Sequence, residues 1–189
     1  MKYLAFGIGG FAACMILLTL LVTIWLPARQ FWPPGEKSWK YYLHWSLVTL
    51  FNLSLVIVAY LDWNTWLFPR PESLIAGGLL ALGGAGIFLY SERYFETDET
   101  MGLAGDLHTD WPYARSCNPQ YVGMIVGMVG FIFLVNSALV TFLGVLNAAW
   151  VFLLPFAEEP WFTEEFGEVY QQYYEQVPRF VGLRSFRVP

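Results

Sequence analysis

The chain has 189 residues, of which 57% are hydrophobic, 19% aromatic and only 13% charged. This composition is typical of an integral membrane protein, and the length suits one domain of several helices. The net charge of −5, with ten Lys and Arg that form no run, argues against a nucleic-acid partner. The two cysteines, Cys14 and Cys117, define no disulfide framework.

Three apolar segments in the first 90 residues are each close to the length of about 20 residues that crosses a bilayer: Ala5–Leu26, Trp45–Trp63 and Ser73–Tyr90. The first is predicted to be an anchor and not a signal peptide, because it lacks a small-x-small cleavage site and ends at an aromatic and basic edge. In the third, Gly77-Gly78 and Gly83-Gly84-x-Gly86 are expected to let another helix approach closely.

The apolar region Tyr121–Phe156 follows a long polar stretch, Ser91–Gln120. One straight helix of this length would measure about 54 Å and overshoot the hydrocarbon core. We therefore expect two antiparallel helices of roughly 16 to 18 residues, turning at the polar point Asn136-Ser137. Trp161–Tyr174 is predicted to be an interfacial helix, with Thr163 as its N-cap.

These elements predict an all-α integral membrane protein with about five transmembrane helices, including a C-terminal hairpin followed by a cytosolic interfacial helix. Residues 1–189 form a single membrane domain. Residues 1–90 provide three spans, and residues 91–189 provide a cofactor-binding loop, the hairpin and the tail.

The distribution of Lys and Arg predicts the orientation. With five spans, one side of the membrane carries Lys2 and Arg70, and the other side carries the remaining eight cations, Arg187 among them. The positive-inside rule then places the N-terminus outside and residues 91–120 and 157–189 in the cytosol.

Two polar clusters return to this predicted cytosolic boundary. Glu158-Glu159 is expected at a helix end, and Asn118-Pro119 is expected to form a turn that starts the helix carrying Tyr121. Each feature alone is explained by structure, as a solvated helix stop, a turn and an aromatic-belt residue. Together they predict a shared polar pocket in which two carboxylates favour a cationic group.

Other chemistries find little support in the sequence. It has no nucleophile-elbow pattern, and His44 and His108 lie in different parts of the chain. No His, Cys or Asp cluster has the spacing of metal ligands, so no metal site is predicted. The spans contain almost no ionisable residues, which argues against ion transport.

From Tyr113 to Phe180 the chain resembles the isoprenylcysteine carboxyl methyltransferases and their relatives, the membrane phospholipid methyltransferases. The family pattern is Gly-Pro-Tyr, Arg-His-Pro-x-Tyr, a helical hairpin, Glu-Glu, Phe-Gly-x-x-Tyr-x-x-Tyr and Val-Pro-Arg-Phe. The corresponding segments are Pro112-Tyr113, Asn118-Pro119-Gln120-Tyr121, Glu158-Glu159-Pro160, Phe166-Gly167-x-x-Tyr170-x-x-Tyr173 and Val177-Pro178-Arg179-Phe180.

The resemblance implies a membrane methyltransferase that binds S-adenosylmethionine on the cytosolic side and methylates a lipid-like or small hydrophobic acceptor entering from the bilayer. The residues implied in cofactor binding are Tyr113, Asn118, Pro119, Tyr121, Glu158 and Glu159. Those implied in catalysis are Glu159, Tyr121 and Arg115.

The chain departs from the family pattern at two positions. Cys117 stands where the family has Arg, and Trp111 stands where it has Gly. Asn118 replaces His but still donates and accepts hydrogen bonds, and Arg115 is the nearest cation that could replace the lost guanidinium. Two alternatives therefore stay open: an accessory subunit of a membrane complex that keeps the fold without catalysis, and an NADPH-dependent membrane reductase.

Overall fold

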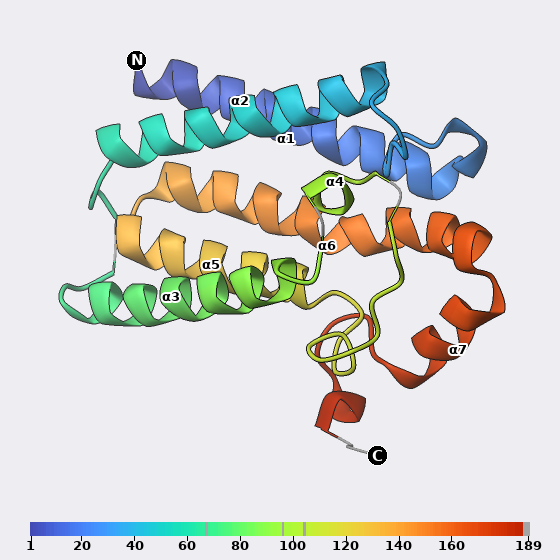
Figure 1. Ribbon diagram of the computed structural model, residues 1–189. Helices are drawn as coiled ribbons and strands as arrows, with labels where there is room; N and C mark the ends of the chain where they lie inside the picture. Colours follow the sequence, from blue (N-terminus) through green and yellow to red (C-terminus); the bar gives the residue numbers. More distant parts are fainter. Residues whose placement is uncertain (67, 96, 104, 187–189) are drawn as a thin grey trace.

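The protein is described by a computed structural model that covers residues 1–66, 68–95, 97–103 and 105–186. Arg187, which contributed to the predicted charge asymmetry, lies outside the described residues, as do positions 96 and 104 of the polar stretch. Figure 1 shows a bundle of long helices with the C-terminal segment at one end.

The described residues form helices and no strand. The helices are α1 (Lys2–Trp25), α2 (Trp39–Leu61), α3 (Glu72–Glu92), α4 (Thr97–Thr100), α5 (Pro119–Val135), α6 (Ala138–Phe166) and α7 (Glu168–Gln176), with short 3-10 turns at Pro27–Arg29 and Leu183–Phe186. By length and composition α1, α2, α3 and α6 can cross a membrane, and α5 is a shorter apolar helix. The expected all-helical membrane fold is confirmed, and the expected number of spans agrees roughly with these five helices.

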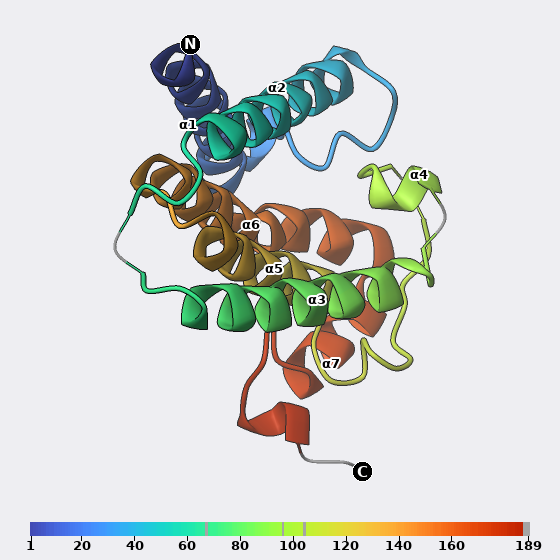
Figure 2. The ribbon, with the colours of Figure 1, turned by 90° about the vertical axis from the view of Figure 1, so that its left-hand side faces the viewer.

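The long helices are arranged in successive pairs. Helix α1 packs against α2 and α6, α6 also packs against α5, and α5 packs against α3. Figures 1 and 2 show α6 and α5 lying between the α1–α2 pair and α3, with α7 and the C-terminal segment at one end of the bundle. Helices α1 and α2 therefore lie on the far side of α6 from α3.

Glycines allow α3 and α5 to pack in backbone contact. A Cβ atom added at Gly84 would lie 2.2 Å from the backbone nitrogen of Gly127, and one added at Gly77 would lie 2.8 Å from the carbonyl oxygen of Gly130. Such spacing needs residues without a side chain. The expected close approach is confirmed for Gly77 and Gly84, whereas a Cβ atom added at Gly78, Gly83 or Gly86 would meet nothing within 4 Å.

The hairpin turns at the predicted polar point. Helix α5 ends at Val135, and Asn136 adopts a left-handed conformation with φ of 53°. The Asn136 side chain accepts a hydrogen bond from the Phe68 backbone at 3.1 Å and donates to Asn64 Oδ1 at 2.9 Å. Ser137 then caps α6 by accepting from the Val140 backbone nitrogen. The turn is thus fixed by polar contacts to the loop between α2 and α3.

Helix α6 does not end where the sequence suggested. We expected Glu158-Glu159 at a helix end, but α6 continues through Pro155 and Pro160 to Phe166. Each proline removes one helical hydrogen bond, yet long apolar helices tolerate this loss when their neighbours support the backbone. Pro155 is fully buried. The expectation was wrong, and both carboxylates project from the body of a helix.

The predicted interfacial helix, Trp161–Tyr174, begins later in the structure than we expected. Residues 161–166 complete α6, and α7 begins at Glu168 after Gly167, whose φ of 57° is readily adopted only by glycine. Thr163 is therefore not an N-cap: its hydroxyl donates to the Glu159 carbonyl inside α6 at 2.8 Å. Gly167 therefore sets the boundary between α6 and α7.

The α3–α5 contact yields a stability prediction. Gly84→Ala is expected to lower the unfolding temperature in detergent, because its Cβ meets backbone that cannot move aside; overpacking of this kind costs about 1–3 kcal/mol. Gly78→Ala is the matched control, since it makes the same change on the same helix in open space and gains helix propensity. Equal unfolding temperatures for the two variants would contradict the close packing.

Candidate functional site

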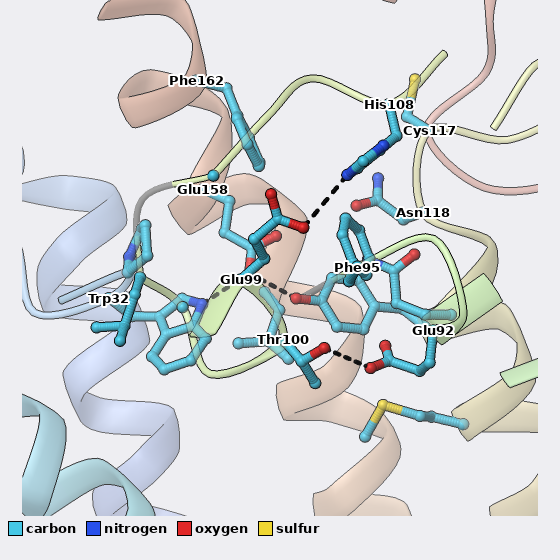
Figure 3. A pocket seen from close by; sticks show the side chains of 18 of the residues that line it. Trp32, Glu92, Phe95, Glu99, Thr100, His108, Cys117, Asn118, Glu158 and Phe162 are labelled. Atoms are coloured by element: carbon cyan, nitrogen blue, oxygen red, sulfur yellow. Dashed lines mark hydrogen bonds and ion pairs between the residues drawn. The ribbon is translucent and has the colours of Figure 1, made fainter. Parts of the chain in front are cut away.

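A cavity of about 360 Å³ lies at the end of the bundle where the segment between α3 and α5 passes over α6 (Figure 3). Its walls come from the loop after α1, from α2, from the α3–α5 segment, and from α5, α6 and α7. Its described lining includes no Lys or Arg. The titratable acids and histidines in that lining are Glu92, Glu99, Asp106, Glu158, His44 and His108. The cavity is therefore acidic.

The buried carboxylate of Glu158 is the most constrained polar group in the cavity. It accepts hydrogen bonds from Trp32 Nε1 at 2.7 Å and from the Tyr121 hydroxyl at 2.5 Å. These donors come from the loop after α1 and the first turn of α5, so one carboxylate joins three parts of the chain. Both donors are neutral, so a cation that entered the cavity would meet a carboxylate without a cationic partner in the described lining.

Trp32 is a site residue that the sequence analysis missed. The Thr23 hydroxyl accepts hydrogen bonds from the backbone nitrogens of Phe31 at 2.9 Å and Trp32 at 3.3 Å, which fixes the loop after α1. The indole ring of Trp32 stacks on His44 of α2 with 4.1 Å between ring centroids. Nothing in the local sequence distinguishes Trp32 from the other tryptophans near the membrane edge; only the distant Glu158 does.

The segment after α3 forms one side of the cavity and is held by polar contacts. Thr100 donates to Glu92 at 2.7 Å, and His108 lies 3.3 Å from Glu99 (Figure 3). The Gly35 backbone nitrogen donates to the carbonyl of Gly102 at 3.1 Å, which ties this segment to the loop after α1. The two loops thus enclose the cavity together.

Tyr113 and Asn118 lie further along the same segment, where Tyr113 packs against Phe95 with 5.4 Å between ring centroids. The Tyr113 hydroxyl donates to Gln120 Oε1 at 3.4 Å, and the Asn118 side-chain nitrogen donates to the Arg179 carbonyl at 3.0 Å. Burial, followed by the negative charges of Glu92 and Glu99, raises the pKa of Tyr113. The Tyr113 hydroxyl therefore stays protonated at neutral pH and serves only as a neutral hydrogen-bonding group.

Glu159 lies beside the cavity and not in its lining. Its carboxylate pairs with Arg179, which donates through Nε and, at 2.9 Å, through Nη2. Arg179 also donates to the Tyr174 hydroxyl and lies 4.0 Å from the centre of the Phe156 ring. This ion pair connects α6 to the segment after α7.

The structure brings together four of the residues predicted for the site: Tyr113, Asn118, Tyr121 and Glu158 all line the cavity. Pro119 and Arg115 face a second hollow on the other side of the same segment. The guanidinium of Arg115 donates to the Ser185 carbonyl at 2.6 Å. Phe162 and Tyr170 line the cavity as well. Tyr170 was part of the aromatic motif but not of the predicted site, and Phe162 was in neither.

A family model described as Phospholipid methyltransferase matches residues 73–169, just over half of the chain. The match runs from the start of α3 into α7, and it includes Glu92, Asn118, Tyr121 and Glu158 but neither Trp32 nor Arg179. No curated protein and no solved structure matches the chain significantly.

Cys117 provides a pH-dependent probe of the cavity. Burial is the main cause that raises the pKa of its thiol to about 11. Only the thiolate is alkylated, so iodoacetamide labelling of folded Cys14→Ala protein is expected to be slow at pH 8 and to rise only as the pH approaches 11. The folded protein also holds the thiol proton more tightly than the unfolded chain does. Cys117 is therefore expected to lower the stability of the folded state as the pH rises from about 9 towards 11, and to have no such effect below about pH 9.

The control for this experiment is the same variant unfolded in dodecyl sulfate, which is expected to label with an ordinary thiol profile. Labelling of the folded protein that follows the unfolded profile would show that Cys117 is solvated. The two profiles are compared by mass spectrometry of the peptide that contains Cys117.

Proposed function

The chain belongs to the phospholipid methyltransferase family, and on that premise we propose that it transfers a methyl group from S-adenosylmethionine to a lipid-like or small hydrophobic acceptor. Membership of the family supports a membrane methyltransferase activity in general; the donor, the acceptor class and the membrane face are our proposals. The observation that carries them is the acidic, aromatic-lined cavity around Glu158.

The cavity suits the proposed donor in size and charge. Its volume of about 360 Å³ lies within the range of about 300–1,000 Å³ typical of small-molecule sites. S-adenosylmethionine, when bound, supplies an electrophilic methyl group on a positively charged sulfur. Carboxylates and the faces of aromatic rings both favour positive charge, and the cavity offers Glu158 together with Trp32, Phe162 and Tyr170.

We assign the polar contacts of the donor to the residues whose positions are fixed by other interactions. Glu158 is held by Trp32 and Tyr121 and would accept from a cationic group. Tyr113 would contribute a hydroxyl that remains protonated, since burial raises its pKa. Asn118 would contribute its side-chain oxygen, because its nitrogen already donates to Arg179.

Methyl transfer forms a bond between the acceptor lone pair and the methyl carbon while the carbon–sulfur bond breaks. Such a displacement depends on alignment and on the exclusion of water. The segment from Glu92 to His108 is suited to exclude water, because its contacts to Gly35 and its internal pairs hold it against the bundle. No catalytic base is assigned among the cavity residues.

Glu159, Arg115 and Pro119 were predicted for the site, and their positions suggest indirect roles. Glu159 binds Arg179, whose carbonyl accepts from Asn118. We therefore propose that Glu159 is a positioning residue that holds the tail against the site. Pro119, the first residue of α5, would orient the turn that carries Asn118. Arg115 is considered with the second hollow below.

The proposed acceptor is hydrophobic because part of the cavity lies between helices of the bundle. Its apolar wall is formed by Val48 of α2, Met124 of α5, and Trp150 and Leu154 of α6. An acceptor with a prenyl or acyl chain would place that chain against these residues and its reactive group near Glu158. The bilayer would supply such an acceptor directly.

The two alternatives differ in their support. An NADPH-dependent reductase would need cations for the 2′-phosphate, and the described lining of the cavity has none, which argues against it. A non-catalytic accessory subunit keeps some support, because Cys117 replaces the family arginine and offers no charge to the donor's carboxylate. Any partner in a membrane complex would belong to this second alternative.

Isothermal titration of the detergent-purified protein with S-adenosylmethionine, and separately with NADPH, tests the proposal. Glu158→Gln is expected to weaken S-adenosylmethionine binding by about tenfold to a hundredfold, because a hydrogen bond to a charged group contributes about 1.5–3 kcal/mol. Glutamine keeps the acceptor oxygen for Trp32 and Tyr121, so the fold should survive.

Glu159→Gln is the matched control next in the sequence. It is expected to weaken binding by less than about fivefold, since a partly exposed ion pair contributes up to about 1 kcal/mol. Equal losses in both variants would make Glu159 a direct contact as well. No binding of S-adenosylmethionine by the wild type would contradict the methyltransferase proposal and favour the accessory subunit.

We also propose that the cavity end of the bundle faces the cytosol, since the chain places most of its Lys and Arg there. Leu183 is 86% exposed. In a Cys14→Ala, Cys117→Ala background, Leu183→Cys is expected to react with an impermeant maleimide only after the cells are permeabilised. Glu72→Cys, at the start of α3 and the opposite end, should react in intact cells. The reverse pattern would invert the orientation.

A further inference from the structure

A second hollow, of about 630 Å³, lies against α3 on the side of residues 111–122 that faces away from the cavity. The segment alternates between the two: Cys117, Asn118 and Tyr121 line the cavity, whereas Ser116, Pro119 and Val122 line the second hollow. We call this hollow the α3 groove. Besides these three, its described lining includes Gly83, Gly86, Tyr90, Trp111 and Arg115.

Two glycines of α3 line this groove without serving helix packing. A Cβ atom added at Gly83 or Gly86 would meet nothing within 4 Å, in contrast to Gly84, which contacts α5. Gly83 and Gly86 therefore leave this part of the groove without side chains, so an occupant has room against the backbone of α3.

Arg115 gives the groove its charge. It is the only cation among the described lining residues, and it makes no ion pair with a described residue. One guanidinium nitrogen donates to the Ser185 carbonyl, and the group lies 5.5 Å from the centre of the Trp111 ring. The fixed guanidinium retains donors for an anion, whereas the hydroxyl of Ser116 donates to Arg179 and accepts from Asn118.

The α3 groove opens on a surface whose composition is typical of contact with lipid. Helix α3 exposes large apolar side chains along its length, including Leu79, Leu82 and Leu89, as expected of a helix that faces lipid. Tyr90 and Trp111 lie at its end, where aromatic residues mark the membrane boundary. A groove with an apolar floor and a cation at the boundary matches the shape of a lipid with a charged head group.

We propose that the α3 groove binds one membrane lipid with an anionic head group. Its acyl chain lies over Gly83 and Gly86, and its phosphate pairs with Arg115 at the membrane boundary. The bound lipid contacts Ser116 and Pro119 on the groove side of the turn. It therefore stabilises the turn that places Asn118 in the cavity on its other side. This lipid is separate from the methyl acceptor, because residues 116–122 stand between the two hollows.

Native mass spectrometry of the full-length protein in detergent tests the proposal. The protein is titrated with phosphatidylglycerol or with phosphatidylcholine of the same chains. We expect one phosphatidylglycerol molecule to bind at least about tenfold more tightly than phosphatidylcholine. Both lipids carry a phosphate, but the choline cation offsets its charge, so only phosphatidylglycerol presents a net anionic head group to Arg115. Arg115→Gln should abolish this preference, and Arg115→Lys should retain part of it.

The apolar half of the groove has its own variants. Gly86→Leu fills the groove and is expected to weaken phosphatidylglycerol binding by about tenfold or more, because the chain loses buried methylene contacts. Gly78→Leu makes the same substitution on α3 in open space outside the groove, and should bind like the wild type. Unfolding temperatures of both variants confirm that each is folded.

Three results would overturn the proposal. Equal affinity for the two lipids would show that Arg115 does not select an anionic head group. Equal losses of affinity in the two glycine variants would show that the lipid does not bind in the α3 groove. Displacement of the lipid by glycerol phosphate alone would show that the site recognises a free phosphate and not a lipid. A stable dimer that excludes lipid would assign the groove to a second copy of the chain.

Discussion

The buried carboxylate of Glu158 is the point through which the two halves of the site are joined. A carboxylate inside a bundle of apolar helices must be hydrogen-bonded, since an isolated buried charge is too costly. Trp32 and Tyr121 supply those bonds at 2.7 Å and 2.5 Å. Because Trp32 follows α1, Tyr121 begins α5 and Glu158 lies in α6, satisfying one group also fixes the relative positions of three elements around the cavity.

The opposite end of the bundle shows the same principle. Asp62, at the end of α2, is buried and accepts hydrogen bonds from Lys2 of α1 at 2.7 Å and from Ser137 at the start of α6 at 2.6 Å. Between these two polar ends most of the buried side chains are apolar, and the α3–α5 pair relies on backbone contact at Gly77 and Gly84. Polar groups therefore fix the helix ends, and size and shape govern the middle.

Local signals in the sequence predicted much of this fold. Apolar length predicted the spans, and Asn136-Ser137 marked the hairpin turn because a left-handed conformation there suits asparagine. The continuation of α6 past Glu158-Glu159 to Phe166 was not predicted, because Pro155 and Pro160 both lie inside the helix and neither ends it. The later start of α7 follows from Gly167, whose positive φ separates α7 from α6 and which the predicted range Trp161–Tyr174 had placed inside one helix.

The site divides in the same way. Tyr113, Asn118, Tyr121 and Glu158 were predicted from ordered motifs and line one cavity. Trp32 was not, because its partner lies 126 positions away in the chain. The different directions of Glu158 and Glu159, one into the cavity and one towards Arg179, could not be predicted either, since adjacent residues of a helix point about 100° apart and the sequence does not say which one faces inward.

Residues 177–179, which follow α7 and hold the turn at Asn118, affect the order in which the protein is assembled. The backbone nitrogen of Cys117 donates to the Pro178 carbonyl at 2.9 Å, and the Asn118 side chain donates to Arg179. Every helix from α1 to α7 precedes these residues. During synthesis the bundle can assemble in the bilayer while the turn at Asn118 still lacks its partners. The site is therefore completed last, only after the ribosome has released Arg179, and a nascent chain halted before that residue has the helices but not the finished pocket.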